Sequence, residues 1–91
     1  GAVCIVEGTT LCGIITDGDI RRALQVGEKF FSRVAKDFMT AHPIVATPDM
    51  LAYDALRMME DRNSQISVLP VVDTHGVWRG LLRLHDIVRN F

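Results

Sequence analysis

The chain contains an internal repeat, and this feature limits its possible folds more than any other. When the sequence is shifted by 67 residues, the segment "GIITDGDIRRAL" (13–24) falls on "GLLRLHDIVRNF" (80–91), with a shared glycine and a shared aspartate. The apolar segments just before also match, "VCIVE" (3–7) with "LPVVD" (69–73), with one extra residue in the second turn. A repeat indicates one supersecondary unit used twice. The sequence therefore predicts two copies of strand, turn, strand and helix, and an α+β fold.

The first copy is expected to begin with a hairpin. Residues 1–16 are apolar and β-branched on either side of a turn at 7–10, which predicts two paired strands. Residues 17–26 predict a helix, and Gly27 is the expected stop. Residues 28–40 are amphipathic, and we expect a short helix or loop that lies over the core.

The second copy has an additional strand and helix in front of it. Residues 44–46 predict a short strand, and Thr47-Pro48-Asp49 predicts the start of a helix that runs to Arg62. We expect its buried face to consist of Leu51, Ala55, Met58, Met59 and Arg62, and we expect Asn63 to end it. The remaining predicted elements are a strand over 66–72, with an edge or bulge at Pro70, a return strand over 77–84 and a helix over 85–91.

Composition narrows the class of protein. The chain has 91 residues, a net charge of −1 and interspersed charges, so it carries no basic stripe for nucleic acid and no polybasic or bilayer-spanning segment. A chain this short buries a modest core, and we expect a homodimer or larger assembly. Cys4 and Cys12 could face each other across the hairpin, but unbridged thiols in a cytoplasmic protein are the preferred interpretation.

These motifs resemble the CBS domain, named from cystathionine β-synthase. The resemblance rests on "DFMT…P" and on the ending Gly-x-x-[Thr/Ser]-x-x-Asp. Residues 37–91 resemble one whole repeat and residues 1–24 the last half of another. The implied organisation is a partial first repeat over 1–28, a connecting segment over 29–40 and a second repeat over 41–91. Roughly one strand and one helix of the first repeat are expected upstream.

A narrower resemblance concerns the arabinose-5-phosphate isomerase family. "TDGDIRR" together with "LHD" is similar to the CBS pair at the C-terminus of these enzymes, which act early in the synthesis of Kdo for lipopolysaccharide. The resemblance implies a sugar isomerase domain upstream. It assigns the isomerase activity to that domain and not to this chain, so this chain is not expected to be an enzyme.

The resemblance also implies ligand contacts. In nucleotide-binding CBS pairs the motif places Thr16 near phosphate and Asp19 on the ribose hydroxyls, in a cleft between the repeats. We expect Asp17, Gly18 and Arg22 to contribute as well, since a helix start offers N–H groups to anions and glycine permits close approach. The alternative is structural, because Thr16-x-x-Asp19 is also a capping box that needs no ligand.

The second copy departs from the motif. Asp86 is present, but Arg83 stands where the first copy has Thr16, so a reciprocal box does not account for Asp86. Arg83 could meet a phosphate or carboxylate, or could be a surface residue or an ion-pair partner of Asp86. His85 is a further candidate contact. We therefore treat Arg83, His85 and Asp86 as a second, less regular ligand site.

Two functions stay open from the sequence. The preferred one is a regulatory module that binds a nucleotide or nucleotide-sugar, with CMP-Kdo as an attractive effector, and adjusts an attached isomerase. The alternative is a structural module that holds subunits together without a ligand. The sequence shows no nucleophile with a base and orienting acid, and its histidines lack metal-ligand spacing, so we expect no catalytic residues, no metal and no cofactor.

Overall fold

The computed structural model describes residues 1–62 and 65–89. The chain divides into two compact units, Gly1–Pro43 and Ile44–Phe91. Each unit combines strands with helices, so the fold is α+β, as expected. Within the described residues, none of the helices combines the length and apolar character that a bilayer span requires.

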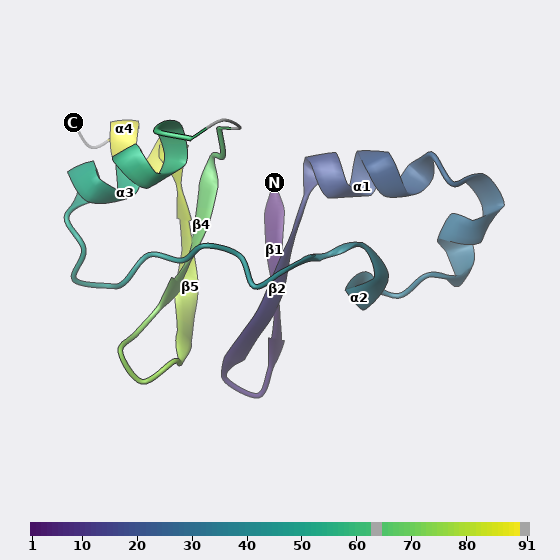
Figure 1. The fold of residues 1–91 in the computed structure, drawn as a ribbon, viewed down its shortest axis with the longest axis horizontal. Coiled ribbons are helices and arrows are strands. Elements are labelled where there is room, and N and C mark those ends of the chain that lie inside the picture. The colour runs from purple at the N-terminus through teal and green to yellow at the C-terminus, as the bar shows by residue number, and fades with distance from the viewer. Residues whose placement is uncertain (63–64, 90–91) are drawn as a thin grey trace. The chain divides into compact units, whose positions relative to one another are not determined.

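Unit 1 (Gly1–Pro43) is built on the expected hairpin. Strand β1 (Ala2–Glu7) pairs antiparallel with β2 (Thr10–Thr16) through a tight turn in which Gly8 has φ +62°. Helix α1 (Asp17–Leu24) follows β2 directly (Figure 1). The short strand β3 (Thr40–Ala41) pairs with the other edge of β2. The hairpin and the helix that follows it are confirmed.

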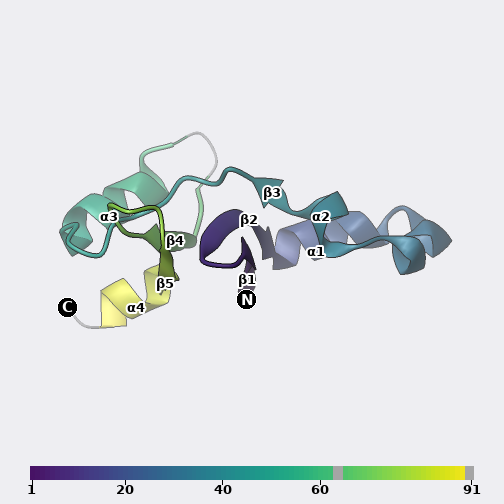
Figure 2. The ribbon, with the colours of Figure 1, turned by 90° about the horizontal axis from the view of Figure 1, so that it is seen from below.

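The segment between α1 and β3 forms two short helical turns. A 3₁₀ helix, η1 (Gly27–Ser32), is followed by α2 (Ala35–Phe38), which packs beside α1 (Figure 2). We expected residues 28–40 to lie over the core, and only part of this segment packs against its neighbours. The rings of Phe30 and Phe38 lie 5.9 Å apart, but Phe31 is 85% exposed.

Unit 2 (Ile44–Phe91) begins differently from the prediction. The strand expected at 44–46 is a single parallel bridge between Ala46 and Val71. Thr47-Pro48-Asp49 forms a turn, in which the N–H of Met50 donates to the Thr47 carbonyl oxygen over 3.1 Å. Helix α3 (Ala52–Glu60) therefore starts later than predicted, with no side-chain cap at Leu51. A Thr-Pro-Asp sequence suits a turn as well as a helix start, which explains the error.

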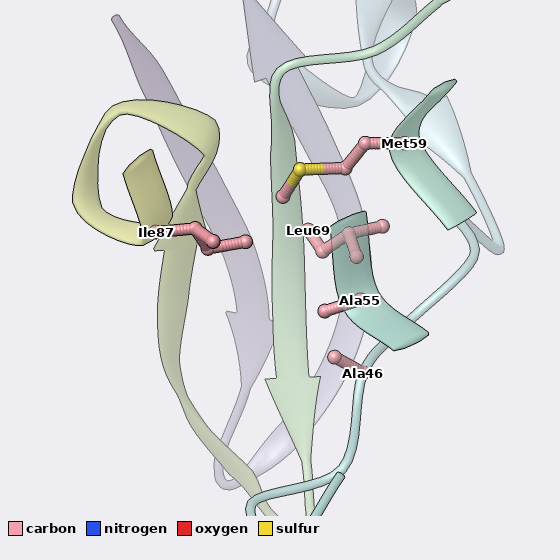
Figure 3. Close-up of a cluster of buried hydrophobic side chains, with 5 residues drawn as sticks. All are labelled: Ala46, Ala55, Met59, Leu69 and Ile87. Atoms are coloured by element: carbon pink, nitrogen blue, oxygen red, sulfur yellow. The ribbon is translucent and has the colours of Figure 1, made fainter. Parts of the chain in front are cut away.

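The core of unit 2 lies between α3 and two later elements. Strand β4 (Val68–Val72) and helix α4 (Leu84–Arg89) face α3, and apolar side chains converge on β4 (Figure 3). The predicted buried face of α3 is correct at Ala55 and Met59. It is wrong at its ends, because Leu51 is 68% exposed and Arg62, which lies beyond the helix, is also exposed. The buried cluster consists of Ala46, Ala55, Met59, Leu69 and Ile87. Asn63, the expected terminator, lies outside the described residues.

The two hairpins share the same irregularity in their register. Strand β4 pairs antiparallel with β5 (Trp78–Arg83), and the register shifts between Val71 and Val72. In the first hairpin the shift falls between Ile5 and Val6, the matching residues of the repeat. The buried Pro70 lies immediately before the second shift, in a two-stranded sheet, which agrees with the expected edge or bulge. The structure thus repeats where the sequence repeats.

Candidate functional site

The start of α1 is closed by a reciprocal cap. Thr16 has an extended backbone and its Oγ1 accepts the N–H of Asp19 over 3.4 Å. In return, Asp19 Oδ2 accepts the backbone N–H of Thr16 over 2.9 Å and the Thr16 hydroxyl over 3.1 Å. This is the predicted capping box. The arrangement fixes the Asp19 carboxylate at the junction of β2 and α1.

Asp19 is a buried carboxylate whose charge is compensated by one exposed arginine. The side chain of Asp19 is 7% exposed, whereas that of Arg22 is 69% exposed. Arg22 Nη2 donates to Asp19 Oδ1 over 2.5 Å. Burying a carboxylate without a partner is strongly unfavourable, so this ion pair makes the burial of Asp19 possible. The predicted residues Thr16, Asp19 and Arg22 are therefore brought together.

Gly18 lies beneath the same guanidinium. A methyl group added at Gly18 would come within 3.4 Å of Arg22 Nη1 and 3.7 Å of Thr16 Oγ1. The close approach expected at Gly18 is thus made by the Arg22 side chain in this structure. Any ligand that reaches this glycine must meet the guanidinium as well.

Asp17 lies apart from Asp19. Its side chain is 72% exposed, and its backbone N–H donates to the Gly1 carbonyl oxygen over 3.2 Å. Asp17 does not line the groove next to Asp19. The structure therefore separates Asp17 from the other predicted residues of the first site.

An open groove of about 410 Å³ extends from Asp19 within unit 1. It lies between α1 and the segment that contains α2, and it combines two arginines, two aspartates and an apolar wall. Arg33 contributes to it, and its guanidinium has no ion-pair partner among the described residues. The lining residues are Asp19, Arg22, Ala23, Val26, Arg33, Asp37, Phe38 and Met39. Such a mixture fits a ligand with both an anionic group and a flat apolar part.

Most of these lining residues were absent from the sequence prediction. The wall of the groove on the α1 side could have been found from the sequence, because its residues recur at helical spacing, at positions 19, 22, 23 and 26. The opposite wall is only partly visible in the sequence, because Phe38 belongs to the amphipathic segment 28–40, whereas Arg33 and Met39 lie just after η1 and α2.

The second copy keeps half of the cap. The backbone N–H of Arg83 donates to Asp86 Oδ2 over 3.4 Å, but a guanidinium has no acceptor for the return bond, so a reciprocal box does not form at Asp86, as expected. The Arg83 guanidinium also binds both carboxylate oxygens, Nε to Oδ2 over 3.0 Å and Nη2 to Oδ1 over 2.7 Å. Of the open alternatives for Arg83, the ion pair is the one observed. His85 is exposed between the two residues.

The ion pair of the second copy changes the acidity of both partners. The hydrogen bonds from Arg83 hold the pKa of the Asp86 carboxyl below its usual value of 3.8. The same bonds raise the pKa of Arg83.

Among residues 1–62 and 65–89, the structure contains no group of three or more His, Cys, Asp or Glu side chains placed to hold a metal ion. Neither Cys4 nor Cys12 forms a disulfide within this part of the chain.

Comparison with known proteins connects this geometry to one family. The CBS domain family matches residues 35–91. The arabinose 5-phosphate isomerase KdsD of Pseudomonas aeruginosa is 39% identical over 96% of this chain and 26% of its own length. KdsD of Francisella tularensis is 33% identical over 98% of this chain and 27% of its own length. The chain thus spans about a quarter of the length of these curated relatives.

Solved structures with the same fold include nucleotide and nucleoside complexes. The CBS domain pair of protein MJ0100, in complex with 5′-methylthioadenosine and S-adenosyl-L-methionine, has a TM-score of 0.83 and 32% identity, and the match covers 99% of this chain and 71% of that one. CBSX2 of Arabidopsis thaliana, in complex with AMP, has a TM-score of 0.81 and 28% identity, with 98% and 69% covered.

Proposed function

We propose that this chain, which belongs to the CBS domain family, is a regulatory module that binds a nucleotide or nucleotide-sugar at the start of α1. The single observation that carries the proposal is the buried Asp19 carboxylate at the end of an open groove that also contains Arg22 and Arg33. The complexes of CBSX2 with AMP and of MJ0100 with adenosine derivatives support the class of ligand.

The chemistry of the groove suits the three parts of a nucleotide. A carboxylate can accept two hydrogen bonds from a vicinal diol, which assigns the ribose to Asp19. The phosphate is assigned to the N–H groups at the start of α1 and to the guanidinium of Arg22. Phe38 and Val26 supply apolar surface for the base. Thr16 serves this site by holding Asp19 Oδ2 in place.

The regulated partner is proposed to be an attached sugar isomerase domain. The relatives named KdsD support this assignment, because they match the chain over about a quarter of their own length. The effector we favour is CMP-Kdo, which carries a ribose diol, a phosphate and a carboxylate and would report the output of the pathway. Asp86, with Arg83 and His85 beside it, is the proposed weaker second site. The setting of such regulation would be the cytoplasm.

The alternative is a structural module that promotes dimerisation without binding a ligand. One observation favours it: Asp19 is bound by Thr16 and Arg22 of the same chain, so the cap and the ion pair account for this residue without a ligand. Exposed apolar side chains such as Phe31 and Val34 would then lie in the subunit contact.

Isothermal titration calorimetry separates these functions. The chain is titrated with AMP, ATP, CMP and CMP-Kdo, and the same titrations are made on Asp19→Asn, which keeps an acceptor for the cap but removes the charge. The regulatory proposal predicts heat of binding for at least one nucleotide and a clear loss of affinity in Asp19→Asn. Absence of binding for all four ligands, together with a stable dimer, would establish the structural alternative instead.

A further inference from the structure

The Asp19–Arg22 ion pair restricts access to the carboxylate. A carboxylate offers about four acceptor positions on its two oxygens. Two donors from Thr16 occupy Asp19 Oδ2, and Arg22 Nη2 occupies Oδ1. A vicinal diol needs two acceptor positions that can be reached from the groove. Arg22 must therefore leave Asp19 before a ribose can bind in that manner.

The exposure of the two partners shows which of them can move. Asp19 is held by Thr16 and is nearly covered, whereas Arg22 is largely exposed on a flexible side chain and lies across Gly18. The next cation along the groove, Arg33, has no ion-pair partner among the described residues. The groove beyond Asp19 therefore offers an anion a second guanidinium, beside the Asp37 carboxylate that also lines the groove, and the Arg22 side chain can turn toward an anion bound there.

Releasing Arg22 is unfavourable unless both partners are satisfied again. A buried carboxylate that loses its partner is strongly destabilised, and the guanidinium also loses a charge-assisted hydrogen bond. A nucleoside would replace only the donors on Asp19. A phosphate alone would satisfy only the guanidinium. A nucleoside phosphate satisfies both groups at once.

We propose that Arg22 is a specificity-determining residue, which exchanges the Asp19 carboxylate for the ligand phosphate and so makes the site selective for nucleoside phosphates over nucleosides. This inference rests on the proposed function, because it concerns the same site. The exchange made by Arg22 differs from a simple phosphate contact in its effect on ligands that lack the anion. An exchanging arginine weakens the binding of ligands that lack the anion, whereas a simple contact leaves their binding unchanged.

The test compares AMP with adenosine on four proteins by calorimetry. The full chain is measured beside Arg22→Ala and the control Arg21→Ala, which removes the same charge one position away on the exposed side of α1. For Arg22→Ala we expect AMP affinity to fall about tenfold and adenosine affinity to rise about threefold. Arg21→Ala should change neither affinity. Arg22→Gln, which keeps a donor for Asp19, should give an intermediate result.

The outcomes separate the inference from the function on which it rests. Weaker AMP binding with unchanged adenosine binding in Arg22→Ala would overturn the exchange and leave only a phosphate contact. Weaker binding of both ligands would reduce Arg22 to a structural role and would equally overturn the inference. If the unmodified chain binds neither AMP nor any nucleotide in the earlier titrations, the proposed function fails, and this inference fails with it.

Discussion

Asp19 and Asp86 occupy the same position in two matching hairpin–helix segments, and each carboxylate accepts the backbone N–H of the residue three positions before it. The side chain at that earlier position differs. Thr16 adds a short hydroxyl to one oxygen, whereas the Arg83 guanidinium binds both oxygens. Asp19 is 7% exposed and Asp86 is 32% exposed. Both carboxylates are paired with an arginine, but the first is buried beside a groove, whereas the second is more exposed and has both oxygens bound by Arg83.

The cap at Thr16 should stabilise α1 measurably. Replacing Thr16 with Ala removes the acceptor for the Asp19 N–H and should lower the free energy of unfolding by about 1 kcal/mol. Thr16→Ser keeps the hydroxyl and should lose much less. Urea denaturation followed by circular dichroism measures both variants. Equal stability of Thr16→Ala and the unmodified chain would show that the cap contributes nothing.

The ion pair of the second copy predicts a pH dependence. Since folding lowers the pKa of Asp86 below 3.8, its stabilising contribution is complete above that value and is lost as the pH falls through the lower folded value. In Arg83→Gln the pKa of Asp86 should rise toward 3.8. Nuclear magnetic resonance titration of the carboxyl carbon measures this value directly. An Asp86 pKa that is the same in both proteins would contradict the assignment to Arg83.

The two glycines that begin the repeated segments should respond differently to substitution. A methyl group on Gly13 would come within 2.5 Å of Met39 Sδ and 2.7 Å of the Thr40 carbonyl oxygen, whereas nothing lies within 4 Å at Gly80. Gly13→Ala must displace backbone, and it should lower the free energy of unfolding by about 1–3 kcal/mol. Gly80→Ala should be neutral or slightly stabilising, since glycine weakens a strand.

Thermal and urea denaturation of the two glycine variants provide the comparison. Gly13 and Gly80 match in the repeat, and both lie in strands that follow a turn. Comparing the two variants therefore separates the effect of the close contacts at Gly13 from the effect of losing a glycine. A Gly13→Ala chain as stable as Gly80→Ala would mean that β3 does not pack against β2 as described.

Two adjacent methionines test the core of unit 2. Met59 is fully buried among the residues of α3, β4 and α4, whereas Met58 is only partly buried beside them. Met59→Ala should lower the free energy of unfolding by about 2–5 kcal/mol, because it leaves a cavity. Met58→Ala should have a clearly smaller effect. Equal losses in urea denaturation would contradict the assigned face of α3.

Local patterns were sufficient to predict the two hairpins and the cap. The hairpin of unit 1 has apolar, β-branched strands and a glycine in its turn, and the spacing of Thr16 and Asp19 allows the cap within a single helical turn. The matching register shifts confirm the repeat independently, since they fall at equivalent residues of the two hairpins. These features depend on neighbours in the sequence, which is why they could be found there.

Other features depend on contacts between residues far apart in the chain. The start of α3 was misplaced because Thr47-Pro48-Asp49 suits both a turn and a helix start, and the packing of Ala55 and Met59 decides between them. Likewise, Met39 reaches Gly13 only because β3 pairs with β2. The far wall of the groove follows in part from that pairing, so the sequence pattern alone revealed it only in part.

The nucleotide can be located on the chain most directly by ¹⁵N–¹H nuclear magnetic resonance, with AMP, ATP, CMP and CMP-Kdo titrated in turn. If Asp19 holds the ribose, at least one nucleotide gives saturable shifts of the Gly18 and Asp19 amides, with smaller shifts at Asp86, and Asp19→Asn abolishes the shift at Gly18. Saturable binding that leaves the amides of Gly18 and Asp19 unchanged would contradict a site at the start of α1, as would the absence of any shift with all four nucleotides.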